Sequence, residues 1–319
     1  MDMVSQEQII GIDVSRDCLD VHCLPDGSRL RIANTAQGHE QLAEIAHDRR
    51  ALVCFEATGG QEWRLWAALD AAGIEARQLP PAQIKAFATS RGTRAKTDRI
   101  DAELIARFMA FRPDAGRTLP AQKLRLLRAL TGKRGQLVET RKRLLLQIKA
   151  RQKQGLGEQF KKMDDALHLL LDAQISELEN KIERLVAADE ALAENARILR
   201  SVPGIGPVAS TMLIAEMPEL GQISGAQAAA LTGLAPIARD SGALRGKRAI
   251  GGGRHLLRHV MFQAALVASH HNPVLKPFAD RLRAAGKPHK VVITAVARKL
   301  VTIVNALCKS RQNWTVPAT

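Results

Sequence analysis

The chain of 319 residues contains no tyrosine, and only 3% of its residues are aromatic. The absence of tyrosine excludes every enzyme class that attacks its substrate through a tyrosine hydroxyl. Cysteine is also scarce, and no two cysteines stand at the paired two-residue spacing of a zinc site. Neither a zinc site nor a disulfide framework is therefore indicated, and reduced thiols in a cytoplasmic protein fit best. The four cysteines are Cys18, Cys23, Cys54 and Cys308.

Long apolar runs are missing as well. No signal peptide is expected at the N-terminus, and the apolar stretch at 260–269 is too short to span a bilayer, so no membrane partner is expected. Hydrophobic residues nevertheless make up 46% of the chain. A chain of this length and composition can bury two or three separate cores.

Positive charge is concentrated in two segments. Residues 121–163 hold 13 Lys and Arg against two acidic residues, a net charge of +11, and residues 239–319 hold 15 against two, a net charge of +13. Because the whole chain carries +15, the remainder is acidic, at −9. Two basic surfaces on an otherwise acidic protein favour a polyanionic partner such as nucleic acid. A solvated surface without a partner is the alternative.

The pattern of the chain predicts three parts. Residues 1–115 alternate strand-like segments near 8–15, 18–24 and 51–56 with helical ones, which indicates an α/β domain. Residues 116–200 form long helices, and residues 201–319 form a further, mainly helical domain. In the middle part, leucine and isoleucine recur from 171 to 199 at four-three spacing, interrupted at Asp189. This seam predicts either a homodimeric coiled coil or an intrachain hairpin with the basic helix.

Four carboxylates in the first third of the chain follow the order Asp13, Glu56, Asp98 and Asp101. Asp13 interrupts a strand-like apolar run, and Glu56 closes another. Asp98 and Asp101 are three residues apart at an expected helix start, so they share one helix face. Carboxylate oxygens are the ligands that hard cations such as Mg²⁺ take beside a phosphate. The ordered set therefore predicts one metal site for Mg²⁺, with Mn²⁺ as the alternative ion.

Each of these acids also has a purely structural interpretation. Asp98 is placed to cap a helix, and the helix dipole favours Asp101 in the first turn. Asp13 and Glu56 could each be a solvated acid on a strand. Only the four together shift the balance towards a metal site.

The C-terminal third combines glycine-bearing turns with cations. The turn at 202–207 contains Gly204 and Gly206, whose backbone N–H groups can face a phosphate as in helix-hairpin-helix modules, although glycine is also ordinary in turns. Ser241 lies among glycines and cations, where its hydroxyl is suited to attack a phosphate; a plain surface serine is the alternative. The cations predicted to bind nucleic acid are Arg141, Lys142, Arg143, Arg245, Lys247, Arg248, Arg254 and Arg258.

Together these motifs resemble the DEDD transposases of insertion sequences, the 110/1111 group that also includes Piv-type DNA invertases. Segments 11–15, 55–59 and 96–102 are similar to the acidic motifs of that family, and segments 202–206 and 233–236 are similar to signatures of its C-terminal transposase domain. The tail at 281–300 points to the 1111 branch. The resemblance covers nearly the whole chain.

The resemblance implies a RuvC-like, ribonuclease-H-type N-terminal domain, a coiled-coil middle and a C-terminal domain with a nucleophilic serine, which Ser241 matches. It further implies a recombinase that forms a covalent phosphoserine with DNA, depends on Mg²⁺ and is guided by a non-coding bridge RNA. A dimer or tetramer in the bacterial cytoplasm, associated with the nucleoid, is then expected. Two alternatives stay open, namely a RuvC-like DNA junction endonuclease that uses water and a non-catalytic scaffold that binds nucleic acid.

Overall fold

The computed structural model describes residues 8–92, 98–238, 240–241, 246 and 248–316, with the backbone alone at 98–100. The chain divides into two compact units, Met1–Pro120 and Ala121–Thr319. The first boundary thus falls close to the predicted end of the α/β domain. The predicted division of the remainder at residue 200 stays a prediction.

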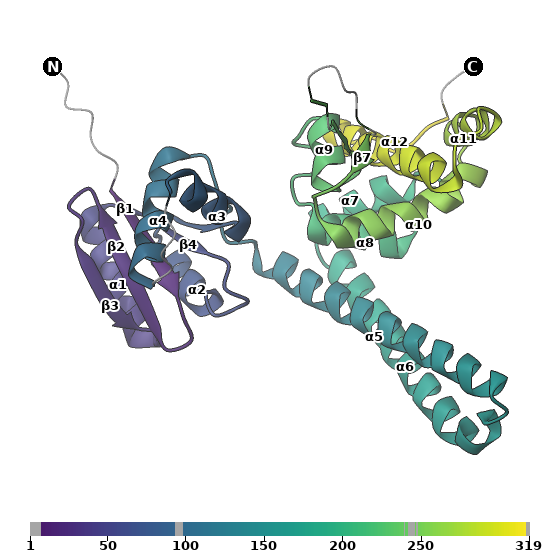
Figure 1. Cartoon of the computed structure of the whole chain (residues 1–319), viewed down its shortest axis with the longest axis horizontal. Helices are drawn as coiled ribbons and strands as arrows, with labels where there is room; N and C mark the ends of the chain where they lie inside the picture. Colours follow the sequence, from purple (N-terminus) through teal and green to yellow (C-terminus); the bar gives the residue numbers. More distant parts are fainter. Residues whose placement is uncertain (1–7, 93–97, 239, 242–245, 247, 317–319) are drawn as a thin grey trace. The chain divides into compact units, whose positions relative to one another are not determined.

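A five-stranded sheet is the centre of the first unit (Figure 1). β1 pairs antiparallel with β2 and parallel with β4, and β5 continues the parallel side. The strands predicted near 8–15, 18–24 and 51–56 are confirmed. β3 was not predicted because it is an edge strand with only Ile32 buried, and β5 because it is four residues long and half polar. In the spatial order β3-β2-β1-β4-β5, the strands are Arg29–Ala33, Cys18–Leu24, Ile9–Val14, Leu52–Glu56 and Ala76–Leu79.

Helices cover both faces of this sheet. On one face, Ile10, Ile12 and Phe55 pack in a core with side chains of α1 (Ala36–Arg49) and α2 (Trp63–Ala71). On the other face, Ile9 and Cys54 pack with side chains of α3 (Pro81–Ser90) and α4 (Asp98–Phe111). Because successive side chains of a strand point to opposite faces, each strand contributes every second residue to the α4 face.

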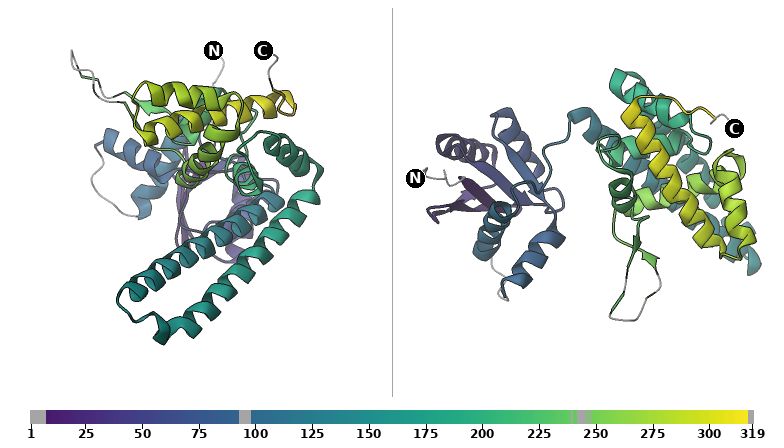
Figure 2. Two further views of the ribbon diagram at one scale, coloured as in Figure 1. Left: turned by 90° about the vertical axis from the view of Figure 1, so that its right-hand side faces the viewer. Right: turned by 90° about the horizontal axis from the view of Figure 1, so that it is seen from above.

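The second unit begins with a helical hairpin. α5 (Gln122–Lys153) and α6 (Gly157–Ala187) run side by side over most of their length (Figures 1 and 2). Leu137 and Leu144 of α5 are buried against Leu171 and Ile175 of α6. The leucine-rich seam therefore closes within the chain, as the hairpin alternative predicted.

The seam does not continue as one helix through residue 199. Asp189 accepts a hydrogen bond from the backbone N–H of Leu192 at 3.1 Å and so caps a new helix, α7 (Glu190–Arg200). An aspartate at this position satisfies an N–H group that has no partner within the helix, which is why the chain breaks and restarts there.

The rest of the second unit is mainly helical, so the predicted fold class, an α/β domain followed by mainly helical structure, is confirmed. Within the described part of the chain, α12 alone is long and apolar enough to cross a bilayer, but half of that stretch is buried in the core. The elements are α8 (Pro207–Glu216), α9 (Gly225–Leu231), β6 (Pro236–Ile237), β7 (Ala249–Ile250), α10 (His255–His271), α11 (Leu275–Ala284) and α12 (His289–Ser310).

Candidate active site and nucleic-acid interface

Two of the predicted acids stand at the ends of neighbouring parallel strands. In the register of β1 and β4, Ile12 lies opposite Phe55. Asp13 and Glu56 are the next residues of their strands, so the two carboxylates lie at the same end of the sheet, where these parallel strands finish. Both side chains are half-buried.

Helix α4 packs on the face to which these two acids point. A Cβ on Gly11 would lie 2.4 Å from the carbonyl oxygen of Ala102 and 2.5 Å from the backbone nitrogen of Ala106, so only glycine lets α4 approach β1 this closely. Asp13 is two residues beyond Gly11 and therefore faces α4 as well. Likewise, Cys54 donates from Sγ to the carbonyl oxygen of Ile105 (3.8 Å), and Glu56 is two residues beyond Cys54.

The N-terminal turns of α4 bring the third acid to the same place. Asp101 is half-buried and immediately precedes Ala102, the residue that contacts Gly11. Asp98 is the first residue of α4; its side chain lies outside the described residues. The structure therefore places Asp13 and Glu56 on the α4 face at the C-terminal ends of two parallel strands. It places Asp101 next to the residue of α4 that meets Gly11, and it starts α4 with Asp98.

The set of carboxylates at this end of the sheet fits a hard cation, because Mg²⁺ and Mn²⁺ prefer carboxylate oxygens. Among the described residues, no three His, Cys, Asp or Glu side chains lie close enough together to hold a metal ion. Asp13, Glu56 and Asp101 all have interaction partners within the protein. The metal-ligand role of the tetrad stays a prediction, which the carboxylate composition of the set supports.

Two further polar residues occupy the α4 face and were not among those predicted from the sequence. Asp20 lies opposite Asp13 and His22 opposite Gly11 in the antiparallel register of β1 and β2, and residues directly opposite share a face. Asp20 is buried and has Arg31 Nε at 3.8 Å from its carboxylate. A signal was available, because both residues interrupt the apolar pattern of β2 at a spacing of two.

His22 is the more constrained of the two. Its side chain is 3% exposed, and neither ring nitrogen has a hydrogen-bond partner. Burial lowers the pKa of this imidazole, because a charged ring would lose its hydration there. His22 is therefore neutral near pH 7 and packs as part of the core under α4.

Ser241 lies in the second unit, on the connection between β6 and β7, and is exposed. The neighbouring Asp240 accepts a hydrogen bond from Arg248 (2.7 Å) and another from the backbone N–H of Gly246 (3.2 Å). These bonds tie the two sides of the connection together next to the serine. Two of the predicted cations, Arg245 and Lys247, lie outside the described residues.

Glycines anchor the base of this hairpin. Gly233 has φ of +67°, and a Cβ there would lie 2.4 Å from the carbonyl oxygen of Gly252. Arg258 of α10 donates to the same carbonyl (3.0 Å). Only glycine permits both the positive φ and the close approach of the two loops, which explains the clustering of glycine on either side of Ser241.

Other predicted contact residues have structural partners. Arg254 forms a two-pronged pair with Glu219 (2.6 and 2.8 Å) and donates to the carbonyl oxygen of Glu216. Gly204 has φ of +108°, and a Cβ there would lie 2.6 Å from Cβ of Ala268 on α10. Contacts of Arg254 and Gly204 with nucleic acid stay predictions, and they would have to coexist with these intrachain roles. Gly206 is the N-cap residue of α8 and is exposed.

The predicted cations of the α5–α6 helical hairpin are paired with acids of the same chain. Arg141 contacts Asp172 of α6 at 2.5 Å, while Lys142 and Arg143 approach Glu139 at 3.8 and 3.4 Å. All three remain partly or fully exposed. A nucleic acid that bound them would therefore compete with carboxylates already in place.

Comparison with known families gives two matches along the chain. A family profile described as a transposase matches residues 10–154, and one described as the IS116/IS110/IS902 transposase family matches residues 196–280. The two profiles between them contain Asp13, Glu56, Asp98, Asp101 and Ser241.

Individual proteins show the same likeness. The pilin gene-inverting protein of Moraxella bovis is 29% identical over 319 residues, which cover 95% of this chain and 96% of that protein. An uncharacterized 43.6 kDa protein of insertion element IS110 from Streptomyces coelicolor is 29% identical over 114 residues, 35% of this chain and 28% of that protein. Among solved structures, T. thermophilus RuvC in complex with a Holliday junction substrate is similar with 16% identity and a TM-score of 0.27, covering 34% of this chain and 98% of that one.

Proposed function

The chain belongs to the IS110 family of transposases, and from that premise we propose that it recombines DNA through a covalent bond between Ser241 and the cut strand. The observation that carries the proposal is the placement of Asp13 and Glu56 at the C-terminal ends of two parallel strands, on the face against which α4, with Asp101 in its N-terminal part, packs. Carboxylates can hold a divalent cation against a phosphate, which a reaction at phosphorus needs and a non-catalytic scaffold does not.

In the proposed reaction, Ser241 Oγ attacks a phosphodiester of DNA. The bond from phosphorus to Oγ forms as Oγ gives up its proton, the bond to the 3′-oxygen breaks, and that oxygen takes up a proton and leaves as a 3′-hydroxyl, so that no proton is gained or lost overall. A 3′-hydroxyl of another strand then attacks the phosphoserine and restores Ser241. Because the number of phosphodiester bonds is conserved, no nucleotide cofactor is required. A divalent cation held by Asp13, Glu56, Asp98 and Asp101 would stabilise the charge that develops on the phosphate.

Three finer features belong to the same proposal. Bridge RNA chooses the sites by pairing with donor and target DNA, a dimer or tetramer supplies at least two active sites, and the protein works in the bacterial cytoplasm on the nucleoid. The predicted route to self-association through Leu171, Ile175 and Ile182 is not open, because these side chains are buried within the chain. A row that includes Met163, Leu167 and Leu170 of α6 is exposed instead and supports association through the hairpin surface.

The test is denaturing electrophoresis after incubation of labelled DNA with the protein, bridge RNA and Mg²⁺. A protein–DNA adduct that survives denaturation, and that the variant Ser241→Ala does not form, supports the serine mechanism. Cleavage without an adduct would instead indicate hydrolysis by water, and binding without cleavage would indicate a scaffold. Omission of RNA or Mg²⁺ from parallel samples tests each requirement separately.

A further inference from the structure

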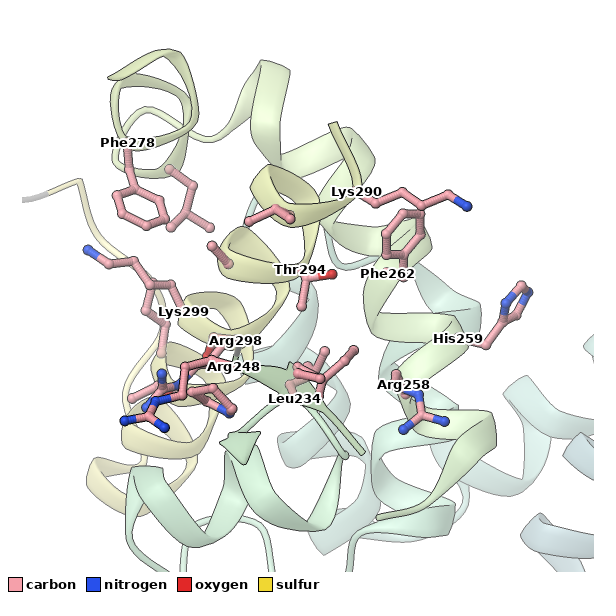
Figure 3. Close-up of a pocket in the computed structure, with 18 of the residues that line it drawn as sticks. Leu234, Arg248, Arg258, His259, Phe262, Phe278, Lys290, Thr294, Arg298 and Lys299 are labelled. Carbon is pink, nitrogen blue, oxygen red and sulfur yellow. The ribbon is translucent and has the colours of Figure 1, made fainter. Parts of the chain in front are cut away.

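The second unit contains a groove whose lining includes two of the cations predicted to bind nucleic acid, Arg248 and Arg258. Its volume is about 1210 Å³, and it lies between the β6–β7 hairpin and helices α10, α11 and α12 (Figure 3). Sites for single small molecules occupy roughly 300–1,000 Å³. The groove is therefore large enough for several linked units of a chain molecule.

The walls of the groove are largely apolar. Phe262 of α10 and Phe278 of α11 lie on either side of Thr294 of α12 (Figure 3), and Ile250 of β7 and Val291 of α12 add to the lining. Ile250 is 39% and Val291 51% exposed, so a substantial part of this surface faces solvent. Half-buried aromatic and exposed aliphatic side chains in one concave surface indicate a ligand with apolar faces.

The charge of the lining has one sign. Five cations contribute to it, and no aspartate or glutamate is present among its described residues. Lys290 and Arg298 are exposed, and their side chains form no ion pair or hydrogen bond within the described part of the chain. Lys299 lies over the ring of Phe278, with Nζ 4.2 Å from the ring centroid. The five cations are Arg248, Arg258, Lys290, Arg298 and Lys299.

A ligand that matches these walls must be a polyanion that also exposes flat apolar faces. Nucleic acid whose bases are unpaired meets both requirements, because phosphates can lie on the cations while bases stack on aromatic and aliphatic side chains. A continuous duplex does not meet them, because its bases are stacked on one another and only its phosphates would be used. The mixture of cations and apolar surface distinguishes the groove from a general phosphate-binding surface.

The position of the groove connects it with Ser241. Arg248 and Ile250 line it, and the chain between β6 and β7 that ends at Arg248 contains Ser241. We propose that the groove holds a short unpaired stretch of the DNA strand that is cut, with its phosphates on Lys290 and Arg298 and its bases against Ile250, Val291 and Phe262. The choice of DNA over RNA rests on the proposed attack of Ser241 on DNA, whereas the preference for unpaired nucleotides rests on the groove alone.

The first experiment measures affinity with the full-length protein in the absence of divalent metal, so that no cleavage intervenes. Fluorescence anisotropy compares a DNA duplex, the same duplex with a short unpaired bubble, and an abasic strand that keeps phosphates but lacks bases. We expect the bubble to bind at least about tenfold more tightly than the duplex and the abasic strand, because stacking of a few bases supplies that difference. Equal binding of all three would overturn the proposal.

Substitutions then locate the binding. The double variant Ile250→Ser/Val291→Ser should remove most of the preference for the bubble and leave duplex binding within about twofold, since it changes no charge. Leu256→Ser/Val267→Ser is the matched control, because both residues are exposed on α10 and neither lines the groove. The same loss of preference in the control would place the binding elsewhere and overturn the assignment.

The cations are tested in the same way. Lys290→Gln/Arg298→Gln should weaken binding of the bubble and flatten its dependence of log affinity on log salt by about two units, one for each lost phosphate contact. Lys287→Gln/Lys309→Gln, which removes two exposed cations outside the groove, should do so much less. Equal effects of the two variants would show that Lys290 and Arg298 do not bind the phosphates of the bubble, and would overturn this part of the proposal.

Two further probes separate the alternatives. A base analogue whose fluorescence depends on stacking, such as 2-aminopurine, is placed in the bubble and should change its emission with the parent protein but not with Ile250→Ser/Val291→Ser. An RNA strand that binds more tightly than DNA, or an acidic helical peptide that displaces the bubble, would overturn the assignment to DNA. Because no cleavage is measured, absence of the Ser241 adduct would refute the proposed function while leaving the preference for unpaired strands intact.

Discussion

The two units of the protein carry their functional side chains in opposite ways. In the first unit, Asp13, Glu56 and Asp101 are half-buried where two strands end against a closely packed helix. In the second unit, Ser241 and the groove cations Lys290 and Arg298 are exposed. Side chains fixed by a sheet and helix suit chemistry at a defined point, whereas exposed cations suit the binding of a long polyanion. We therefore expect the acids to control rate and the cations to control affinity.

A second contrast lies within the second unit itself. In the α5–α6 hairpin, Arg134, Arg141 and Arg151 of α5 each pair with an acid of α6, at 2.5–2.6 Å. In the groove, Lys290 and Arg298 have no such partner within the described residues. Both regions have a high positive charge in the sequence, but the charge available to a ligand depends on what the fold places beside each cation. Net charge alone therefore overstates the hairpin as a binding surface.

The largest expected effect concerns the acids. Asp13→Asn should lower the rate of strand cleavage by orders of magnitude, because a neutral amide is a poor ligand for a hard cation, and should leave DNA affinity almost unchanged. Single-turnover cleavage and anisotropy measured on the same preparation give the two quantities. Asp48→Asn, an exposed acid of α1, is the control and should change neither. If Asp13→Asn lost DNA affinity but kept the cleavage rate, the expectation that the acids control rate and the cations control affinity would be wrong.

Asp98 sharpens the same test. If Asp98 only caps α4, Asp98→Asn should retain activity, since asparagine caps helices about as well as aspartate. If it helps to hold the metal, the variant should be as slow as Asp13→Asn. We expect the slow outcome, because Asp98 begins the helix whose next turn meets Gly11.

The next effect concerns stability of the hairpin. Ile182 is 3% exposed, and Ile182→Lys would bury an unpaired ammonium, which costs several kcal/mol. We expect a lower midpoint of urea unfolding by circular dichroism. Leu170→Lys, on the same helix at a side chain 53% exposed, should leave the midpoint nearly unchanged and lower the oligomer mass in light scattering. An unchanged midpoint for Ile182→Lys together with a lower oligomer mass would instead favour the homodimeric coiled coil over the intrachain hairpin.

A smaller effect compares the two sets of cations. Arg141→Gln/Lys142→Gln/Arg143→Gln removes three charges, which would flatten the salt dependence of duplex affinity by about three units if all were free to contact phosphate. Because Asp172 and Glu139 already neutralise them in part, we expect a change of about one unit or less. Salt titrations of binding to two unrelated duplexes measure it. A full three-unit change would show that nucleic acid displaces the carboxylates.

Local pattern was sufficient to predict much of this arrangement. The alternation around Asp13 and the end of the run at Glu56 place both acids on strands, and the seam from 171 to 185 predicts a helix that needs a partner. Pattern could not identify the partner, because an intrachain helix and a second copy bury the same residues. Asp20 interrupts the apolar pattern of β2, but that pattern alone could not place it opposite Asp13, because this relation exists only in the β1–β2 register. Arg248 and Arg258 were predicted to bind nucleic acid, but the groove that they line was missed because its residues are drawn from Leu234 to Ile303 and meet only in the folded unit.

The smallest expected effect concerns pH and the first unit. The pKa of His22 is lowered by burial below the ordinary 6.5, so below pH 6.5 the unfolded chain takes up a proton that the folded chain does not. The stability of the first unit should therefore be full above pH 6.5, decline as the pH falls below it and level off below the folded-state pKa.

Urea unfolding followed by tryptophan fluorescence in a Trp314→Phe background measures this decline, because the two remaining tryptophans, Trp63 and Trp66, lie in the first unit. Parent and variants are compared at about pH 7.5 and about pH 5.5, on either side of the ordinary imidazole range. His22→Leu should make the difference between the two pH values smaller, whereas His47→Gln, an exposed histidine of α1, should leave it as in the parent. If His22→Leu loses as much stability on acidification as the parent, protonation elsewhere in the first unit causes the decline, and the buried imidazole under α4 is not its source.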